Sequence, residues 1–219
     1  METPEDHLRR ADQTIGAVID EVLSERGGEP LTFESRHSGP PDPNMPTDRY
    51  GVLVRAIVSQ NLSVMASRSI YRRLTERFGS DRAPAPEQVL DDDPDTLCAA
   101  VGLSRAKAAS LQSLAGLIVS GKLDLDGLTD LPDEEVVAQL TTVKGIGVWS
   151  ADMFLMFHLF RPDVLPVGDL SLRRTIERRY GLAGLPGPSE MEQLAEPWRP
   201  YRSLACVYLW ETTHTTPQV

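Results

Sequence analysis

The spacing of its apolar residues is the feature that most constrains the fold of this chain. Apolar side chains recur three or four residues apart, which is the period of an amphipathic α-helix. The alternation expected of a half-buried β-strand is not sustained anywhere. The helical spacing runs through residues 50–58, 66–78, 111–118, 136–140, 149–160, 172–176 and 204–208. We therefore expect an all-α fold without a large β-domain.

Proline and glycine divide the chain into an N-terminal arm and a helical body. Residues 38–46 have the sequence SGPPDPNMP, which is typical of a linker because proline and glycine interrupt helices. We expect residues 1–46 to form an arm that contains a helix and this linker. Residues 47–219 are expected to form the body, with a helical hairpin at about residues 133–160.

The composition restricts both the chemistry and the location of the protein. Two cysteines, Cys98 and Cys206, cannot supply the four thiolates of a structural zinc or iron–sulfur site. Because no signal peptide is recognised, we expect buried thiols in a reducing compartment, which predicts a cytoplasmic protein. No apolar run approaches the roughly 20 residues of a membrane span. We therefore expect no membrane partner.

The charge is distributed unevenly along the chain. The formal net charge is −10. Basic residues nevertheless outnumber acidic ones in residues 49–82 and in residues 144–180. These two basic segments form one anion-binding face only if the fold brings them together. Otherwise their arginines lie on solvent-exposed helix faces.

Residues 143–148, with the sequence VKGIGV, form a very short connection between two predicted helices. Glycine permits positive φ or a close backbone approach in such a turn. Ile146 is expected to fill the junction, while neighbouring amides point outward at the positive end of the next helix. This arrangement suits a phosphate oxygen. An ordinary helix–helix turn with a hydrophobic anchor explains the same residues.

Asp169 follows the hairpin after a loop with the sequence LPVG, where its side chain can cap the next helix. A G-x-G hairpin, a helix of about three turns and an aspartate after a proline-containing loop resemble the helix-hairpin-helix (HhH-GPD) DNA glycosylase superfamily. The resemblance extends over residues 47–211. It implies two helical subdomains flanking a cleft for DNA and the flipped base, with Asp169 as the catalytic carboxylate.

Trp149 narrows the resemblance within this superfamily. Bifunctional glycosylase/lyases carry a Schiff-base lysine at its position, and Lys144 lies on the other side of the turn. Without that amine the lyase reaction lacks its nucleophile. With tryptophan at this position, the chain resembles the alkylation-repair members, the DNA-3-methyladenine glycosylase II type. Further similar blocks are LVRAIVSQNLS at 53–63, GLSRAKA at 102–108 and WRPYRSL at 198–204.

The resemblance implies a base-excision repair glycosylase. Such an enzyme flips alkylated purines, such as 3-methyladenine and 7-methylguanine, out of double-stranded DNA and hydrolyses the N-glycosidic bond. It is expected to be monofunctional, without lyase activity, and monomeric. The implied base pocket contains Trp149, Met153 and Trp210. A relative has tyrosine where this chain has Met153, and a thioether cannot donate a hydrogen bond.

The resemblance also implies how DNA is held. The family places its intercalating wedge between two helices, at Gln60, Asn61 and Leu62 here. A backbone phosphate is expected at Gly145, Ile146, Gly147 and Val148. No cofactor is required. A structural Na⁺ or K⁺ is implied at the backbone carbonyls of Thr141, Val143 and Ile146.

Two other interpretations stay open. One is an HhH glycosylase for mismatched or oxidised bases, which Trp149 and the cysteine count disfavour. The other is a non-catalytic HhH DNA-binding module that uses the hairpin only for phosphates. Such a module needs neither an aspartate after the second helix nor aromatic pocket residues. Asp169, Trp149 and Trp210 therefore distinguish a glycosylase from such a module.

Overall fold

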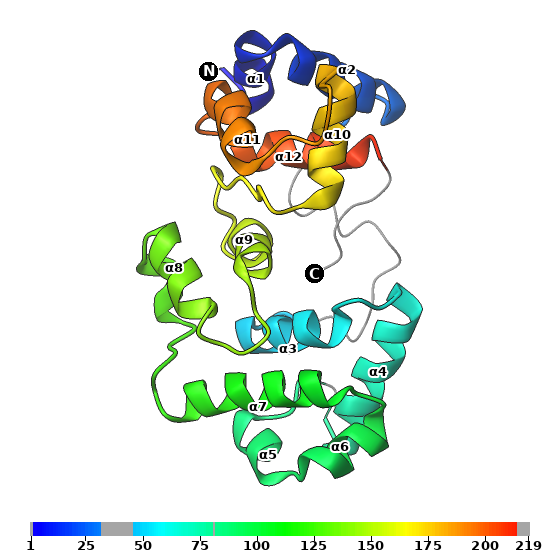
Figure 1. Cartoon of the computed structure of the whole chain (residues 1–219), viewed down its shortest axis with the longest axis vertical. Coiled ribbons are helices and arrows are strands. Elements are labelled where there is room, and N and C mark those ends of the chain that lie inside the picture. The colour runs from blue at the N-terminus through cyan, green and yellow to red at the C-terminus, as the bar shows by residue number, and fades with distance from the viewer. Residues whose placement is uncertain (1, 32–45, 81, 214–219) are drawn as a thin grey trace. The chain divides into compact units, whose positions relative to one another are not determined.

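The computed structural model describes residues 2–31, 46–80 and 82–213. Its regular elements in these ranges are all helices, which confirms the predicted all-α fold (Figure 1). The described residues divide into two compact units. Residues 46–80 and 82–151 form the hairpin unit, and residues 2–31 with 152–213 form the aspartate unit. The chain passes from one unit to the other within helix α9 (Val148–Phe157).

Helix α7 (Arg105–Val119) lies at the centre of the hairpin unit. In Figure 1 it runs between α3 (Arg49–Ser59) on one side and α5 (Pro86–Asp91) with α6 (Pro94–Val101) on the other. The unit also contains α4 (Val64–Arg77), the short 3₁₀ helix η2 (Gly127–Asp130) and α8 (Asp133–Leu140). Apolar side chains fill these contacts, and Ile57, Leu97 and Leu114 are completely buried. Their burial is the main stabilising contribution in this unit.

The helices of the hairpin unit begin where side chains can accept the first backbone amides. Asp48 accepts from Gly51 at the start of α3, with 2.7 Å between the amide nitrogen and Oδ1. Ser63 caps α4 and Ser104 caps α7 in the same way. An N-cap of this kind stabilises a helix by about 1 kcal/mol.

Helix α12 (Arg202–Glu211) is the central helix of the aspartate unit. Every residue from Ser203 to Trp210 is buried, and the helix packs on α2 and α10. The other elements of the unit are α1 (Pro4–Ala11), α2 (Gln13–Glu25), α10 (Leu170–Tyr180), α11 (Pro188–Ala195) and the 3₁₀ helix η3 (Glu196–Trp198). A helix buried along its length offers fixed attachment points for the loops around it.

The N-terminal helices α1 and α2 belong to the aspartate unit. Asp12 joins them to the C-terminal part, since its Oδ2 accepts from Tyr180 Oη at 2.6 Å and from Trp198 Nε1 at 3.0 Å. Its Oδ1 caps α2 through Thr14 N. The sequence could not show this, because the partners lie far along the chain. The predicted linker lies almost wholly outside the described residues.

Candidate active site

The turn of the helical hairpin lies between α8 and α9, where it was predicted. Ile146 plugs it, with only 5% of its surface exposed. Gly145 has φ +83, and a Cβ there would meet Ser110 Oγ of α7 at 2.4 Å. Gly147 has no such constraint, and a Cβ there would meet nothing within 4 Å. The protein itself thus requires glycine at 145, whereas the space beside Gly147 is open.

The connection between α3 and α4 is fastened to the hairpin within the same unit. Gln60 Nε2 donates to the carbonyl oxygen of Gly145 at 2.9 Å. Lys107 Nζ of α7 donates to the carbonyl oxygen of Val58 at 2.8 Å, near the end of α3. Asn61 follows with φ +56, a conformation that asparagine tolerates better than most residues. The structure therefore brings the predicted wedge loop and the predicted phosphate turn together.

The tip of this loop presents apolar side chains to solvent. Leu62 is 39% exposed, and Met65, in the first turn of α4, is 74% exposed. Val64 between them is exposed as well. Met65 was not among the predicted site residues. Its position two residues after a helix cap was the only sequence signal for it.

Asp169 is the N-cap of α10 in the aspartate unit and is only 6% exposed. Its Oδ1 accepts the backbone amide of Leu172 at 2.6 Å and the indole Nε1–H of Trp210 at 3.0 Å. Two N–H donors on one oxygen fix the orientation of the carboxylate plane. Asp169 and Trp210 were both predicted site residues, and the structure joins them directly.

A stripe of large side chains lies along one face of α9. Trp149, Met153 and Phe157 are four residues apart, so they follow one another on the same face. Met153 is completely buried and Trp149 is half-buried. The ring of Phe157 lies 6.2 Å from that of Trp210, centroid to centroid. Phe157 therefore contacts the same indole that binds Asp169. The helical spacing from Met153 was the signal that could have identified it.

Asp152 is a second buried carboxyl group on α9, 8% exposed. Burial raises its pKa from 3.8 to about 7. The charged form of a carboxylate is disfavoured where water cannot solvate it, which is the cause of this shift. Asp152 therefore changes its charge close to neutral pH.

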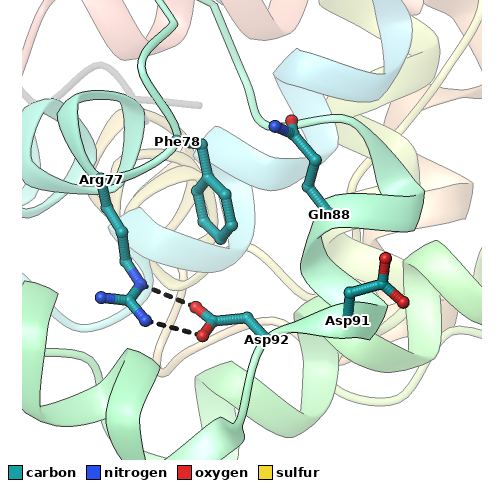
Figure 2. Close-up of a pocket in the computed structure, with 5 residues that line it drawn as sticks. All are labelled: Arg77, Phe78, Gln88, Asp91 and Asp92. Carbon is teal, nitrogen blue, oxygen red and sulfur yellow. Dashed lines mark hydrogen bonds and ion pairs between the residues drawn. The ribbon is translucent and has the colours of Figure 1, made fainter.

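Two arginines of the first basic segment, Arg49 and Arg77, have partners within the hairpin unit. Arg49 donates to Asp126 and to two backbone carbonyls, and Arg77 makes a two-pronged contact with Asp92. The latter pair lines the surface pocket in Figure 2, with Phe78, Gln88 and Asp91. None of the predicted site residues lines this pocket.

Among the described residues, no group of three or more His, Cys, Asp or Glu side chains is placed to hold a metal ion. The backbone carbonyls of Thr141, Val143 and Ile146 fall within the hairpin turn. That of Val143 accepts the amide of Ile146 at 3.1 Å, and a carbonyl oxygen retains a second lone pair. Carbonyl oxygens of this kind are suitable ligands for an alkali cation.

The two glycines of the turn should respond oppositely to alanine. We expect Gly145→Ala to lower the free energy of unfolding by at least about 2 kcal/mol, because it combines a positive φ with the contact to Ser110. Gly147→Ala should be neutral or stabilise by up to about 1 kcal/mol. Urea denaturation measures both. Ser110→Ala should recover part of the loss in the Gly145→Ala background, and equal effects of the two alanines would contradict this account.

Asp152 should make stability depend on pH. Its pKa is raised in the folded state, so its contribution is fully present below about pH 4 and is lost as the pH rises through about 7. Asp152→Asn removes this dependence. The variant should gain stability over the wild type between pH 5 and pH 8, by at most about 4 kcal/mol. Urea titrations at pH 5 and pH 8 measure the free energy of unfolding of both proteins. A difference between variant and wild type that is the same at both pH values would refute this prediction.

No helix in the described ranges has the length and apolar character needed to cross a bilayer. Residues 54–200 match the family model of the HhH-GPD superfamily base excision DNA repair proteins. DNA-3-methyladenine glycosylase 1 of Schizosaccharomyces pombe is 34% identical over 165 residues, which cover 75% of this chain and 72% of that protein.

Solved structures agree with the sequence comparison. The S. pombe 3-methyladenine DNA glycosylase in complex with abasic DNA has a TM-score of 0.76 and 29% identity, covering 99% of this chain and 98% of that one. The DNA-3-methyladenine glycosidase of Bacillus halodurans has a TM-score of 0.76 and 32% identity, covering 98% and 91%. With the hairpin, the capping aspartate and its indole partner in place, the chain belongs to the HhH-GPD superfamily of base excision DNA repair proteins.

Proposed function

We propose that this protein is a DNA glycosylase that hydrolyses the N-glycosidic bond of alkylated purines in double-stranded DNA. The observation that carries the proposal is the buried carboxylate of Asp169, oriented through Oδ1 by Leu172 N and Trp210 Nε1. Relatives named DNA-3-methyladenine glycosylases support the substrate class. The relative solved with abasic DNA supports DNA as the partner.

The reaction needs a fixed negative charge near the sugar. When the N-glycosidic bond breaks, the deoxyribose acquires oxocarbenium character, and a preorganised anion stabilises that charge most effectively where water is scarce. Asp169 meets this requirement because it is nearly buried and already oriented. The carboxylate also orients the attacking water, which forms the new bond to C1′ and releases its proton to solvent, while the purine leaves with the electron pair of the broken bond. No step requires a cofactor.

Aromatic side chains account for the preference for alkylated bases. Methylation at N3 or N7 gives the purine a positive charge, and an electron-rich ring attracts such a cation by roughly 1–2 kcal/mol when both are desolvated. Trp149 and Trp210 are the indoles assigned to this task, and Met153, one helical turn after Trp149 on α9, is assigned to the same pocket. Met153 gives the pocket a polarizable apolar wall without a hydrogen-bond donor.

The hairpin unit is assigned the task of holding the DNA. The backbone amides of Gly145, Gly147 and Val148, before and at the start of α9, suit a phosphate oxygen, whereas the amide of Ile146 donates to the carbonyl of Val143. The open space beside Gly147 supports this assignment, because a ligand can approach the backbone closely only where no side chain is in the way. Asn61 and Leu62 at the exposed loop tip are assigned to the base stack, where they occupy the gap left by the flipped base. A Na⁺ or K⁺ at the carbonyls of Thr141, Val143 and Ile146 would reinforce the turn.

The proposed reaction stops at the abasic site. Trp149 offers no amine for a Schiff base, so the sugar–phosphate backbone stays intact. The protein acts as a monomer in the compartment that holds the chromosome. A non-catalytic HhH module is the second candidate, and it gives no reason for an oriented, buried carboxylate beside an indole. An HhH glycosylase for mismatched or oxidised bases differs from the proposed enzyme in the base that it would release.

Asp169→Asn should abolish base release. The amide keeps the shape of the side chain but not the charge, so the rate should fall at least about a hundredfold. The measurement is chromatography of free bases from duplex DNA treated with a methylating agent. Wild type should release 3-methyladenine and 7-methylguanine, leaving strands intact until alkali is added. Equal release by Asp169→Asn would refute the mechanism, and strand cleavage without alkali would refute the monofunctional assignment.

A further inference from the structure

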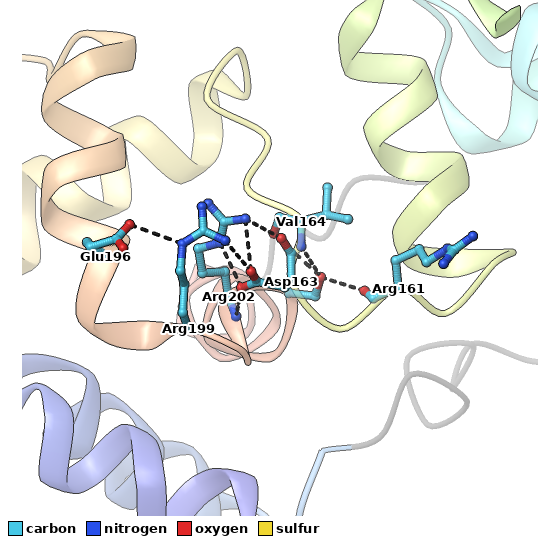
Figure 3. A network of polar contacts seen from close by, with 7 residues as sticks. Arg161, Asp163, Val164, Glu196, Arg199 and Arg202 are labelled. Carbon is cyan, nitrogen blue, oxygen red and sulfur yellow. Dashed lines mark hydrogen bonds and ion pairs between the residues drawn. The ribbon is translucent and has the colours of Figure 1, made fainter. Parts of the chain in front are cut away.

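The loop that leads to Asp169 is attached to helix α12 at two separate points. It connects the end of α9 to the start of α10 and comprises residues 158–169. One attachment is the bond between Trp210 Nε1 and Asp169 Oδ1, already described. The other lies at the opposite end of α12 and involves residues 161–164 (Figure 3). The same buried helix therefore holds both ends of the loop.

Asp163 is the charged centre of the second attachment. Its Oδ1 accepts from Arg202 Nε at 2.7 Å, and its Oδ2 accepts from Arg202 Nη2 at 3.1 Å. Arg199 Nη1 also donates to Oδ2, and Arg199 is itself oriented by Glu196. The Arg202 side chain is 14% exposed and that of Asp163 24%. A two-pronged pair at this depth has a defined geometry, unlike most surface ion pairs.

Backbone contacts extend the attachment beyond the ion pair. Arg202 Nη2 donates to the carbonyl oxygen of Asp163. The Ser203 hydroxyl donates to the carbonyl of Arg161 at 2.7 Å and accepts the amide of Val164 at 2.9 Å. The amide of Ser203 donates to the carbonyl of Pro162 at 3.0 Å. The loop backbone is thus fixed at four consecutive residues.

Helix α12 sets the distance between the two attachments. Ser203 and Trp210 are about two helical turns apart, or roughly 10 Å along the axis. Every side chain from Ser203 to Trp210 is buried, so the helix has a secure position in its unit without the ion pair. Loss of Arg202 would therefore loosen the loop at Asp163 rather than displace the helix, while the bonds made by Ser203 remain.

From these contacts we propose that Asp163 and Arg202 are positioning residues for the carboxylate of Asp169. Neither touches the reacting atoms. They hold the first half of the loop so that its last residue reaches Trp210 and the α10 amides in one conformation. This inference rests on the proposed function, because it assigns Asp169 the chemistry. A displacement of about 1 Å in a catalytic group can cost up to a hundredfold in rate, so even a loosened loop should have a measurable effect.

The test compares Arg202→Ala and Arg202→Lys in single-turnover base excision, with enzyme in excess over DNA containing 7-methylguanine. We expect Arg202→Ala to lower the excision rate at least about tenfold. Its affinity for DNA with a stable abasic-site analogue should change less than about twofold. Arg202→Lys keeps the charge but loses the two-pronged contact, so its rate should be intermediate. Should Arg202→Ala fail to fold, the lysine variant and Ser203→Ala carry the test.

The matched control is Arg77→Ala, which removes another two-pronged Arg–Asp pair. That pair lies in the hairpin unit, at 2.6 and 2.7 Å from Asp92 (Figure 2). Both alanine variants should lower the melting temperature. At temperatures well below melting, only Arg202→Ala should lower the rate of base excision. A wild-type rate for Arg202→Ala, or equal losses in both, would overturn the inference. Full activity of Asp169→Asn in the same series would instead refute the proposed function.

Discussion

The hydrogen bond between the indole of Trp210 and Oδ1 of Asp169 is the interaction on which the proposed chemistry depends. It fixes the carboxylate relative to a helix whose side chains are buried from Ser203 to Trp210. The backbone amide of Leu172, in the first turn of α10, donates to the same oxygen. A capping aspartate at a solvent-exposed helix end has several accessible rotamers, whereas this one has two directional partners and little exposure. A preorganised charge of this kind needs no rearrangement during the reaction.

The division into two units separates two physical requirements. The hairpin unit combines a constrained turn with an exposed apolar loop tip, and Gln60 connects them. These are features for contact with a large, polar partner. The aspartate unit buries the carboxylate of Asp169 and binds it to the indole of Trp210, which the ring of Phe157 contacts. Its features suit chemistry on a single nucleotide. Two arginines of the hairpin unit, Arg49 and Arg77, are paired with carboxylates of the same unit.

Features encoded locally could be predicted from the sequence. Helix starts at Ser63, Ser104 and Asp169 depend on a side chain and an amide three residues later, and the sequence displays both. The hairpin was found for the same reason. Contacts between distant residues could not be predicted. Nothing in the order of residues shows that Gly145 is constrained by Ser110 while Gly147 is not. The same holds for Arg202 with Asp163, and for the N-terminal helices that pack with the C-terminal ones.

The most direct test of the central claim uses two abasic-site analogues that differ only in charge. One carries a pyrrolidine ring, which is cationic at neutral pH and mimics the oxocarbenium charge, and the other a neutral tetrahydrofuran ring. We predict that the wild type binds duplex DNA with the cationic ring at least about tenfold more tightly, a difference of about 1.4 kcal/mol. Asp169→Asn should lose this preference and keep its affinity for the neutral ring. Equal preference in the two proteins would contradict the assignment of Asp169 as the charge that stabilises the transition state.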